Sequence, residues 1–282
     1  MLTVLEVIKK TTEFFAGKGI ESPRLNAELL IGHALGRKRM QLYMEFERPL
    51  AEPELEKIRP LVRRRAGHEP LQYIVGETEF FGLKLACDRR ALIPRPETEQ
   101  LVEQVVQKCA ALAPTRILDL GTGTGAIALA LAQAIPAASV VAVDRSVEAL
   151  ALAQGNATRL GLDARATFHV SNWFDGVPLE PFDVVVSNPP YLTEAETAET
   201  LPEVRGFEPV QALMSADGGV ADLSTIIAGA PRYLKAGGLL ALETGIAQHE
   251  RLLALIEAAG FSRPESKQDL TGRDRFIFAY AG

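Results

Sequence analysis

Residues 187–191, with the sequence Ser-Asn-Pro-Pro-Tyr, combine groups that could hold and orient a reacting nitrogen. They follow the apolar run 182–186, whose valines predict a buried strand of a parallel sheet. Neither Pro189 nor Pro190 has an N–H for the strand ladder, so the strand is expected to end before them. Asn188 is therefore expected at the carboxyl end of a strand, where open α/β sheets place their ligand sites.

The chemistry of this loop follows from its hydrogen-bond acceptors. Asn188 offers a side-chain oxygen, and Pro189 offers a carbonyl that the two proline rings hold stiffly. Two acceptors that converge on one NH2 group would orient and polarise it. Tyr191 supplies a flat face for a planar group. The loop predicts an amide or an exocyclic amino nitrogen as the target, and the alternative is an ordinary strand-to-loop turn with a rigid exit.

A glycine-rich turn at residues 121–125 is the second candidate site. Gly121, Gly123 and Gly125 allow a ligand to approach the backbone closely, and the following helix presents free N–H groups. Asp144 lies 23 residues after Gly121, at the end of the next predicted strand, where a carboxylate can accept hydrogen bonds from a ribose diol. The pair predicts a cofactor of the adenosine type.

The glycine turn alone leaves other interpretations open. Gly121-x-Gly123-x-x-Ala126 also fits the dinucleotide fingerprint, so a nicotinamide dehydrogenase remains an alternative, as does a cofactor-binding adaptor without catalysis. Trp173 follows another predicted strand, and its indole could stack on a purine or could equally be a core or surface tryptophan. Asn172 is a candidate for a hydrogen bond to the adenine.

Composition limits the class of protein. At 282 residues, 47% hydrophobic and 23% charged, the chain fits one large domain, or a large and a small one. Cys87 and Cys109 make no disulfide framework, and the four histidines lack metal-ligand spacing, so we predict no metal site. Without a membrane-spanning run or a signal-peptide pattern, we expect a cytoplasmic protein that does not bind membranes.

The charge is divided unevenly along the chain. Residues 1–75 carry 13 Lys and Arg against 10 Asp and Glu, whereas residues 76–282 carry 17 against 26. A duplex-binding protein is usually more basic than this, so we expect no direct DNA substrate. A basic run on the predicted helix 52–65 could contact an acidic partner or RNA, or could be a solvated helix face with cations near its C-terminus. The run comprises Lys57, Arg59, Arg63, Arg64 and Arg65.

The first 93 residues predict two parts that precede the glycine turn. Residues 1–72 read as a small bundle of short helices, one of which starts with Ser22 as N-cap and Pro23 as its first residue. Residues 73–93 predict a β-hairpin linker, with alternation at 79–85, a turn at 88–90 and a returning strand at 91–93. The next segment, 93–99, is either a rigid linker or a cover over the ligand pocket with Arg95 or Thr98 near it.

After a predicted helix at 97–112, strands and helices alternate from residue 115 onward, which predicts a doubly wound sheet with helices on both faces and an antiparallel pair of strands at one edge. The predicted strands are 116–120, 139–143, 165–170, 182–187, 238–244, 263–269 and 274–280. The predicted helices are 97–112, 126–135, 147–160, 218–234 and 248–259, and Pro231 is expected to kink or break the fourth of them.

Together these residues resemble the S-adenosylmethionine-dependent methyltransferases of the seven-stranded, Rossmann-like type. The run 119–125 (Asp-Leu-Gly-Thr-Gly-Thr-Gly) looks like the cofactor loop of that family, and Asp144 matches its ribose-binding acid. Residues 188–191 match the motif of members that methylate amide or amino nitrogens. This motif is shared by DNA adenine, ribosomal RNA guanine and glutamine methyltransferases, so it does not choose a substrate.

The rest of the chain indicates which family of methyltransferases the sequence resembles. The helical N-terminal region, the Phe80-Phe81-Gly82 run and residues 92–99 (Leu-Ile-Pro-Arg-Pro-Glu-Thr-Glu) look like the peptide chain release factor glutamine methyltransferases. The resemblance implies a recognition domain at 1–72, the linker at 73–93 and a methyltransferase domain at 94–282. It also implies N5-methylation of the glutamine in the Gly-Gly-Gln motif of class-I release factors, with S-adenosylhomocysteine as product. We expect a monomer, and the alternatives are a glutamine methyltransferase acting on a ribosomal protein or an N6-adenine or other amino-group nucleic-acid methyltransferase.

The resemblance also implies roles for the residues of both motifs. The residues expected at the transfer itself are Asn188, Pro189 and Tyr191, and those expected to bind the substrate are Asn188, Pro189, Pro190 and Tyr191. The residues expected to bind the cofactor are Gly121, Thr122, Gly123, Thr124, Gly125, Asp144, Trp173 and Asn188.

Overall fold

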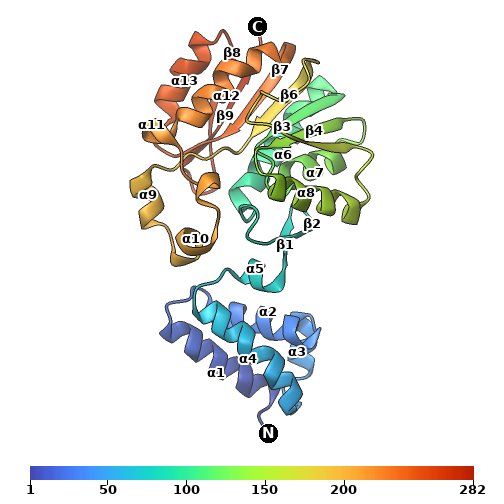
Figure 1. The fold of residues 1–282 in the computed structure, drawn as a ribbon, viewed down its shortest axis with the longest axis vertical. Helices are drawn as coiled ribbons and strands as arrows, with labels where there is room; N and C mark the ends of the chain where they lie inside the picture. Colours follow the sequence, from blue (N-terminus) through green and yellow to red (C-terminus); the bar gives the residue numbers. More distant parts are fainter. The chain divides into compact units, whose positions relative to one another are not determined.

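The structure is a computed structural model, and it describes all residues from Met1 to Gly282. The chain divides into two compact units (Figure 1). A helical unit contains Met1–Glu77 and Leu201–Phe207, and an α/β unit contains Thr78–Thr200 and Glu208–Gly282. Residues 201–207 group with the N-terminal helices although they lie in the second half of the chain.

Five helices of the N-terminal region and one later helix form the helical unit. Its apolar core gathers Val4, Ile8, Ile31, Leu42 and Leu50, all of which are almost fully buried. Burial of such a shared face, more than intrinsic propensity, stabilises short helices. The helices are α1 (Val4–Gly17), α2 (Pro23–Leu35), α3 (Arg39–Met44), α4 (Glu52–Ala66), α5 (Leu71–Val75) and α10 (Pro202–Phe207).

The start of α2 differs from the prediction in its capping. Ser22 precedes the helix as expected, but its φ of 47° is left-handed and its side chain caps no N–H. Its carbonyl instead accepts hydrogen bonds from the backbone and side chain of Asn26. The helix ends before Gly36, whose left-handed φ of 64° suits a glycine after a helix.

The basic run on α4 is mostly engaged within the helical unit. Arg59 pairs with Glu52, and Arg64 pairs with Glu69. Arg65 is only 5% exposed, and its guanidinium donates at 2.8 Å to both Asn26 and Glu203, the latter on α10. Arg65 therefore stabilises this unit and is not part of an exposed basic surface, which corrects one member of the predicted run.

The β-hairpin has a different turn from the one predicted. Its strands are β1 (Glu77–Phe80) and β2 (Leu83–Ala86), and the two-residue loop between them is Phe81-Gly82. Both loop residues have positive φ, 49° and 75°, as a tight hairpin turn of this length requires. The predicted turn at 88–90 is confirmed, because the N–H of Ala91 donates to the carbonyl of Asp88 and residues 89–90 form a turn. The returning strand predicted at 91–93 is wrong, because these residues form no strand.

A seven-stranded sheet organises the α/β unit, in the order β5-β4-β3-β6-β7-β9-β8. The strands from β5 to β7 run parallel, and β9 pairs antiparallel with both β7 and β8. The predicted doubly wound fold with an antiparallel edge is confirmed. The strands are β3 (Arg116–Leu120), β4 (Ser139–Asp144), β5 (Ala166–Val170), β6 (Phe182–Ser187), β7 (Leu234–Glu243), β8 (Ser262–Gln268) and β9 (Asp274–Tyr280).

Helices cover both faces of this sheet, as Figure 1 shows. Alternate residues of one strand enter different cores: Ile117 of β3 packs with α6 and α7, whereas Leu118 packs with α12 and α13. This alternation is the period-two geometry of a strand buried on both faces. The helices are α6 (Pro96–Leu112), α7 (Ala126–Ala134), α8 (Val147–Leu160), α12 (Ala221–Gly229) and α13 (His249–Ala258).

The region between β6 and β7 departs most from the prediction. The helix expected at 218–234 is observed as α12 followed by a 3-10 turn at Ala230–Arg232, so the break expected near Pro231 is confirmed. The helix begins later than expected because Gly218 adopts left-handed backbone angles. Short elements that were not predicted precede it, namely α9 (Glu194–Glu199), η1 (Val210–Ala212) and α11 (Ala216–Gly219), and the 3-10 turn after α12 is η2 (Ala230–Arg232). No helix of the structure is both long and apolar enough to span a membrane.

Candidate active site

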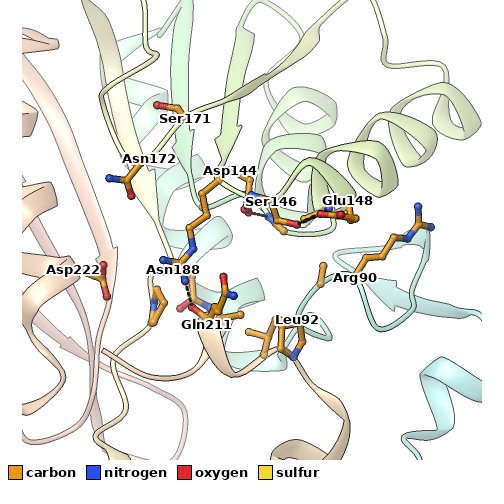
Figure 2. A pocket seen from close by; sticks show the side chains of 18 of the residues that line it. Arg90, Leu92, Asp144, Ser146, Glu148, Ser171, Asn172, Asn188, Gln211 and Asp222 are labelled. Carbon is orange, nitrogen blue, oxygen red and sulfur yellow. Dashed lines mark hydrogen bonds between the residues drawn. The ribbon is translucent and has the colours of Figure 1, made fainter. Parts of the chain in front are cut away.

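A cavity of about 390 Å³ opens in the α/β unit at the carboxyl ends of the parallel strands. Gly121 follows β3, Asp144 ends β4 and Asn188 follows β6, and all three line it. Figure 2 shows Asn172 and Asp222 on one side of this cavity and Arg90 and Glu148 on the other. Its position is the one that doubly wound sheets use for ligands, and its volume suits a small molecule.

Glycine is required at two positions of the turn after β3. Gly121 and Gly125 have positive φ values of 73° and 82°. A Cβ at Gly125 would lie 3.1 Å from the Cβ of Ala153 on α8, which is tighter than side chains normally pack. A Cβ at Gly121 would meet the indole of Trp173 at 3.4 Å. The glycines therefore let the turn pass closely between α8 and Trp173.

The Asp144 carboxylate is held in place by two backbone N–H groups. Gly123 donates to one carboxylate oxygen and Ser146 donates to the other, each at 2.9 Å (Figure 2 shows the bond from Ser146). Each carboxylate oxygen can accept a second hydrogen bond, so the group remains able to bind a diol from the cavity. The strand end and the glycine turn thus fix one acceptor group at the cavity wall.

Asp119 and Thr122 stabilise the glycine turn from its buried side. The Thr122 hydroxyl donates to Asp119 at 2.6 Å, and both side chains are buried. Burial raises the pKa of Asp119 to about 7, and the nearby negative charge of Asp144 contributes in the same direction. These side chains shape the turn and do not reach the cavity.

Trp173 is anchored at both ends of its indole. Its Nε1 donates to Asp222 on α12 at 3.1 Å, and its six-membered ring lies against Gly121. The residue takes a positive φ of 49° and lines the cavity. Trp173 is therefore a fixed part of the cavity wall, next to the glycine turn.

Asn188 is held by a chain of hydrogen bonds that leads into the core. Its Nδ2 donates to the Thr98 hydroxyl at 3.0 Å, and that hydroxyl donates to Glu243 at 2.7 Å. The Tyr191 hydroxyl donates to the other oxygen of Glu243 at 3.1 Å. Burial raises the pKa of Glu243 to about 7 and raises that of Tyr191 as well, with the Glu243 charge adding to the shift of Tyr191.

The structure brings some of the candidate residues to the cavity and leaves others behind it. Those that line the cavity are Gly121, Gly123, Asp144, Trp173, Asn188 and Pro190. Those that do not are Thr122, Thr124, Gly125, Pro189 and Tyr191. Asn172 also lines the cavity. No group of three or more His, Cys, Asp or Glu side chains is placed to hold a metal ion.

The segment before α6 is more than a linker. Arg95 pairs with the buried Glu208 at 2.6 Å, and the same carboxylate accepts from the N–H of Ile93. Thr98, in the first turn of α6, contacts Asn188 as described above. Of the two residues considered from sequence, Thr98 therefore contacts the candidate site, whereas Arg95 anchors the segment that begins at Glu208.

Sequence reasoning missed two residues that hold the site together. Asp222 carries no sequence signal, because its partner Trp173 lies 49 positions earlier in the chain. Glu243 did carry one: it ends β7, which is parallel to β6, with Leu242 opposite Ser187. The rule that pointed to Asp144 and Asn188, a polar residue at the carboxyl end of a parallel strand, applies to Glu243 equally.

Comparison with known proteins finds sequence similarity along nearly the whole chain. The family described as the PrmC N-terminal domain matches residues 6–76, and a methyltransferase domain family matches residues 113–270. The release factor glutamine methyltransferase of Geobacter sulfurreducens is 42% identical over 275 residues, covering 98% of this chain and 95% of that protein. The chain belongs to the release factor glutamine methyltransferase family. The same named enzyme of Vibrio cholerae is 41% identical and covers 97% of this chain and 95% of that protein.

The resemblance inferred from sequence is thereby confirmed. Release factor glutamine methyltransferases are S-adenosylmethionine-dependent protein-glutamine methyltransferases, so the predicted enzyme class is confirmed too. Solved structures agree on the fold alone. The ribosomal protein L11 methylase of Lactobacillus delbrueckii has a TM-score of 0.52 at 20% identity, covering 69% of this chain and 84% of that one. The human Mettl16 catalytic domain has a TM-score of 0.57 at 16% identity, covering 78% and 81%.

Proposed function

We propose that this enzyme methylates the side-chain amide nitrogen (N5) of the glutamine in the Gly-Gly-Gln motif of class-I peptide chain release factors. The observation that carries this proposal is full-length similarity to proteins named for release factor glutamine methylation, combined with an amide-orienting loop at the cavity. We assign recognition of the release factor to the helical region 1–72 and methyl transfer to the α/β unit. We further propose a cytoplasmic monomer without a DNA substrate.

The cavity has the chemistry that S-adenosylmethionine needs. Two ribose hydroxyls require an acceptor, and the Asp144 carboxylate is held at the wall with unused acceptor capacity. Gly121 and Gly123 allow close approach to the backbone of the turn. An adenine ring requires a flat neighbour, and we assign this role to Trp173, which lines the same cavity. The cofactor supplies an electrophilic methyl group on a sulfonium.

The chain's own residues mainly position the target. An amide nitrogen is a poor nucleophile because its lone pair is delocalised into the carbonyl, so orientation is the main source of rate. We propose that the Asn188 side-chain oxygen and the Pro189 carbonyl each accept one N–H of the target amide. Both acceptors bind more strongly as positive charge develops on the nitrogen, which is stabilisation specific to the transition state. Pro190 would maintain the loop conformation.

Tyr191 has a double role in this proposal. Its ring would pack against the plane of the target amide, while its hydroxyl donates to Glu243 and its ring face lies 5.6 Å from the Arg275 guanidinium. These contacts fix the ring. Tyr191 does not line the cavity, whereas its loop neighbours Asn188 and Pro190 do.

The experiment is methyl transfer from labelled S-adenosylmethionine to purified release factor. A release factor whose Gly-Gly-Gln glutamine is replaced by alanine, total RNA, DNA and ribosomal protein serve as parallel acceptors. We expect label on the unaltered release factor alone. Label on nucleic acid or ribosomal protein, or on the alanine-substituted factor, would overturn the proposed substrate.

A further inference from the structure

A buried chain of hydrogen bonds connects Asn188 to the interior of the α/β unit. The Thr98 hydroxyl lies between Asn188 Nδ2, at 3.0 Å, and Glu243 Oε2, at 2.7 Å. Thr98 is 4% exposed and Glu243 is 1% exposed, so water does not compete for these bonds. Asn188 is the cavity-lining end of this chain, and Glu243 is its buried end.

The donors and acceptors in this series of hydrogen bonds can be assigned from what each group is able to donate. A carboxylate only accepts, so the single hydroxyl hydrogen of Thr98 is committed to Glu243. The Thr98 oxygen is then left as an acceptor, and Asn188 satisfies it with its NH2 end. The oxygen of the Asn188 amide is consequently the end left for another partner. A reversed amide would place oxygen against oxygen at Thr98.

We propose that Thr98 and Glu243 are positioning residues that fix the Asn188 side chain with its oxygen, not its NH2 group, available to the target amide. This inference rests on the proposed function, since an acceptor at Asn188 is useful only if the target presents N–H groups. Neither residue touches the substrate. They act through Asn188. They exclude the orientation in which the NH2 group of Asn188, a donor, would face the N–H groups of the target amide, which are donors too.

The charges around Glu243 make this arrangement sensitive to pH. Burial raises the pKa of Glu243 to about 7, and Glu97 on α6 adds to the shift, while Arg275 on β9 and the Tyr191 hydroxyl oppose it. Arg275 itself lies 3.8 Å from the buried carboxylate of Asp269. When Glu243 is protonated, its carboxyl O–H can donate to the Thr98 oxygen. The Thr98 hydroxyl hydrogen is then free to be donated to the oxygen of the Asn188 side chain. We expect the correctly oriented amide to be lost as pH falls below about 7.

Three threonine variants test the relay, by which we mean the hydrogen bonds from Asn188 through Thr98 to Glu243. Thr98→Val keeps the shape of the side chain and removes the hydroxyl, Thr98→Ser keeps the hydroxyl, and Thr225→Val removes an exposed hydroxyl on α12 as a matched control. The measurements are kcat and KM with release factor, cofactor affinity by calorimetry, and the pH profile of single-turnover methyl transfer between about pH 5.5 and 9.

We expect Thr98→Val to lower kcat roughly 10–100-fold, which corresponds to one lost orienting hydrogen bond, with KM and cofactor affinity nearly unchanged. Thr98→Ser is expected to restore the rate to within about threefold, and Thr225→Val to match the wild type. The decrease in rate on the acid side, near the pKa of Glu243, is expected to disappear in Thr98→Val. Equal rates for Thr98→Val and wild type, or equal losses in the Val and Ser variants, would overturn the relay.

A second readout keeps the relay and the proposed function separable. In ¹⁵N-labelled enzyme, the Asn188 side-chain NH2 is expected to exchange with solvent more slowly in the wild type and in Thr98→Ser than in Thr98→Val. If wild type methylates no release factor, the proposed function fails while this exchange still tests the relay. Equal exchange in all three proteins would overturn the relay. If Thr98→Val does not fold, Glu243→Gln takes its place, and it must lose the decrease in rate on the acid side that the wild type shows.

Discussion

The backbone N–H of Gly123 donates a 2.9 Å hydrogen bond to the carboxylate of Asp144, so the glycine turn after β3 and the end of β4 are tied together. The bond explains why a strand-end aspartate and a glycine turn 21 residues earlier act as one unit. A ligand that binds the Asp144 carboxylate is placed against the turn at the same time.

Removing this carboxylate is expected to weaken cofactor binding. For Asp144→Ala we predict a loss of roughly 10–100-fold in affinity for S-adenosylhomocysteine, because one or two hydrogen bonds to a charged acceptor are lost. Equilibrium titration measures the loss directly. Asp163→Ala removes an exposed carboxylate after α8 and serves as control. Unchanged affinity in Asp144→Ala would contradict the assignment of Asp144 to the ribose.

Removing the acceptor at Asn188 is expected to affect the transfer step most strongly. For Asn188→Ala we predict a decrease of roughly 10²–10³-fold in kcat, by analogy with the loss of one group that stabilises developing charge. Cofactor affinity is expected to change by less than about tenfold, because one neutral contact is lost. Single-turnover transfer with bound cofactor measures the step. A variant that binds cofactor and transfers methyl at the wild-type rate would exclude Asn188 from the reaction.

Trp173 gives an optical test of the cofactor class, since it is the only tryptophan in the chain and lines the cavity. We predict that S-adenosylhomocysteine changes its fluorescence in a saturable way and that NAD does not. Trp173→Phe is the control for signals that arise elsewhere. A response to NAD with none to S-adenosylhomocysteine would favour the dinucleotide interpretation of the glycine turn.

The buried carboxyl of Glu243 is expected to make stability depend on pH. Its pKa is raised from 4.5 to about 7 on folding, so between these values the folded state binds more protons than the unfolded state. The free energy of unfolding therefore decreases as pH rises through this window. Asp119 contributes in the same direction, so a comparison of wild type with Glu243→Gln isolates the share of Glu243.

We predict that the stability of Glu243→Gln relative to wild type increases by on the order of 2 kcal/mol between about pH 5 and pH 8. Urea unfolding followed by Trp173 fluorescence reports the α/β unit, where both residues lie. A difference that stays constant, or that decreases with pH, would show that Glu243 does not titrate in this range.

Arg65 and Arg59 lie on the same helix and are expected to differ in their effect on stability. Arg65 is buried between Asn26 and Glu203, and its loss leaves a partly buried carboxylate without its partner. We predict that Arg65→Ala destabilises the helical unit by roughly 3 kcal/mol, whereas Arg59→Ala changes it by less than about 1 kcal/mol. Hydrogen exchange of α4 and α10 measures both. Equal protection in the two variants would contradict the structural role of Arg65.

Most of the sheet could be predicted from sequence because its strands are short apolar runs ended by turn residues. The predicted strands 116–120, 182–187 and 274–280 have the bounds of β3, β6 and β9. A glycine follows the last residue of α2 and of α8, and both of them, Gly36 and Gly161, have the left-handed φ that suits a helix end. In each case the signal is local, in the sense that it lies within a few residues of the feature.

Features that depend on distant partners were not predictable in this way. Thr98 and Asn188 are 90 positions apart, and only the folded sheet brings α6 to the end of β6. The helical unit joins α10 to the N-terminal helices, and the Arg65–Glu203 pair within it links residues 138 positions apart. The hairpin turn, in contrast, could have been predicted from nearby residues, because Gly82 between two short alternating runs is a local signal for a two-residue loop.

The most direct test is to locate the methyl group on the product. Release factor incubated with enzyme and S-adenosylmethionine is digested, and the peptide with the Gly-Gly-Gln motif is fragmented in a mass spectrometer. We predict one added methyl group on the side-chain nitrogen of that glutamine with the wild-type enzyme, and almost none with Asn188→Ala. A methyl group on another residue, or equal methylation by Asn188→Ala, would contradict transfer to an amide nitrogen held by Asn188.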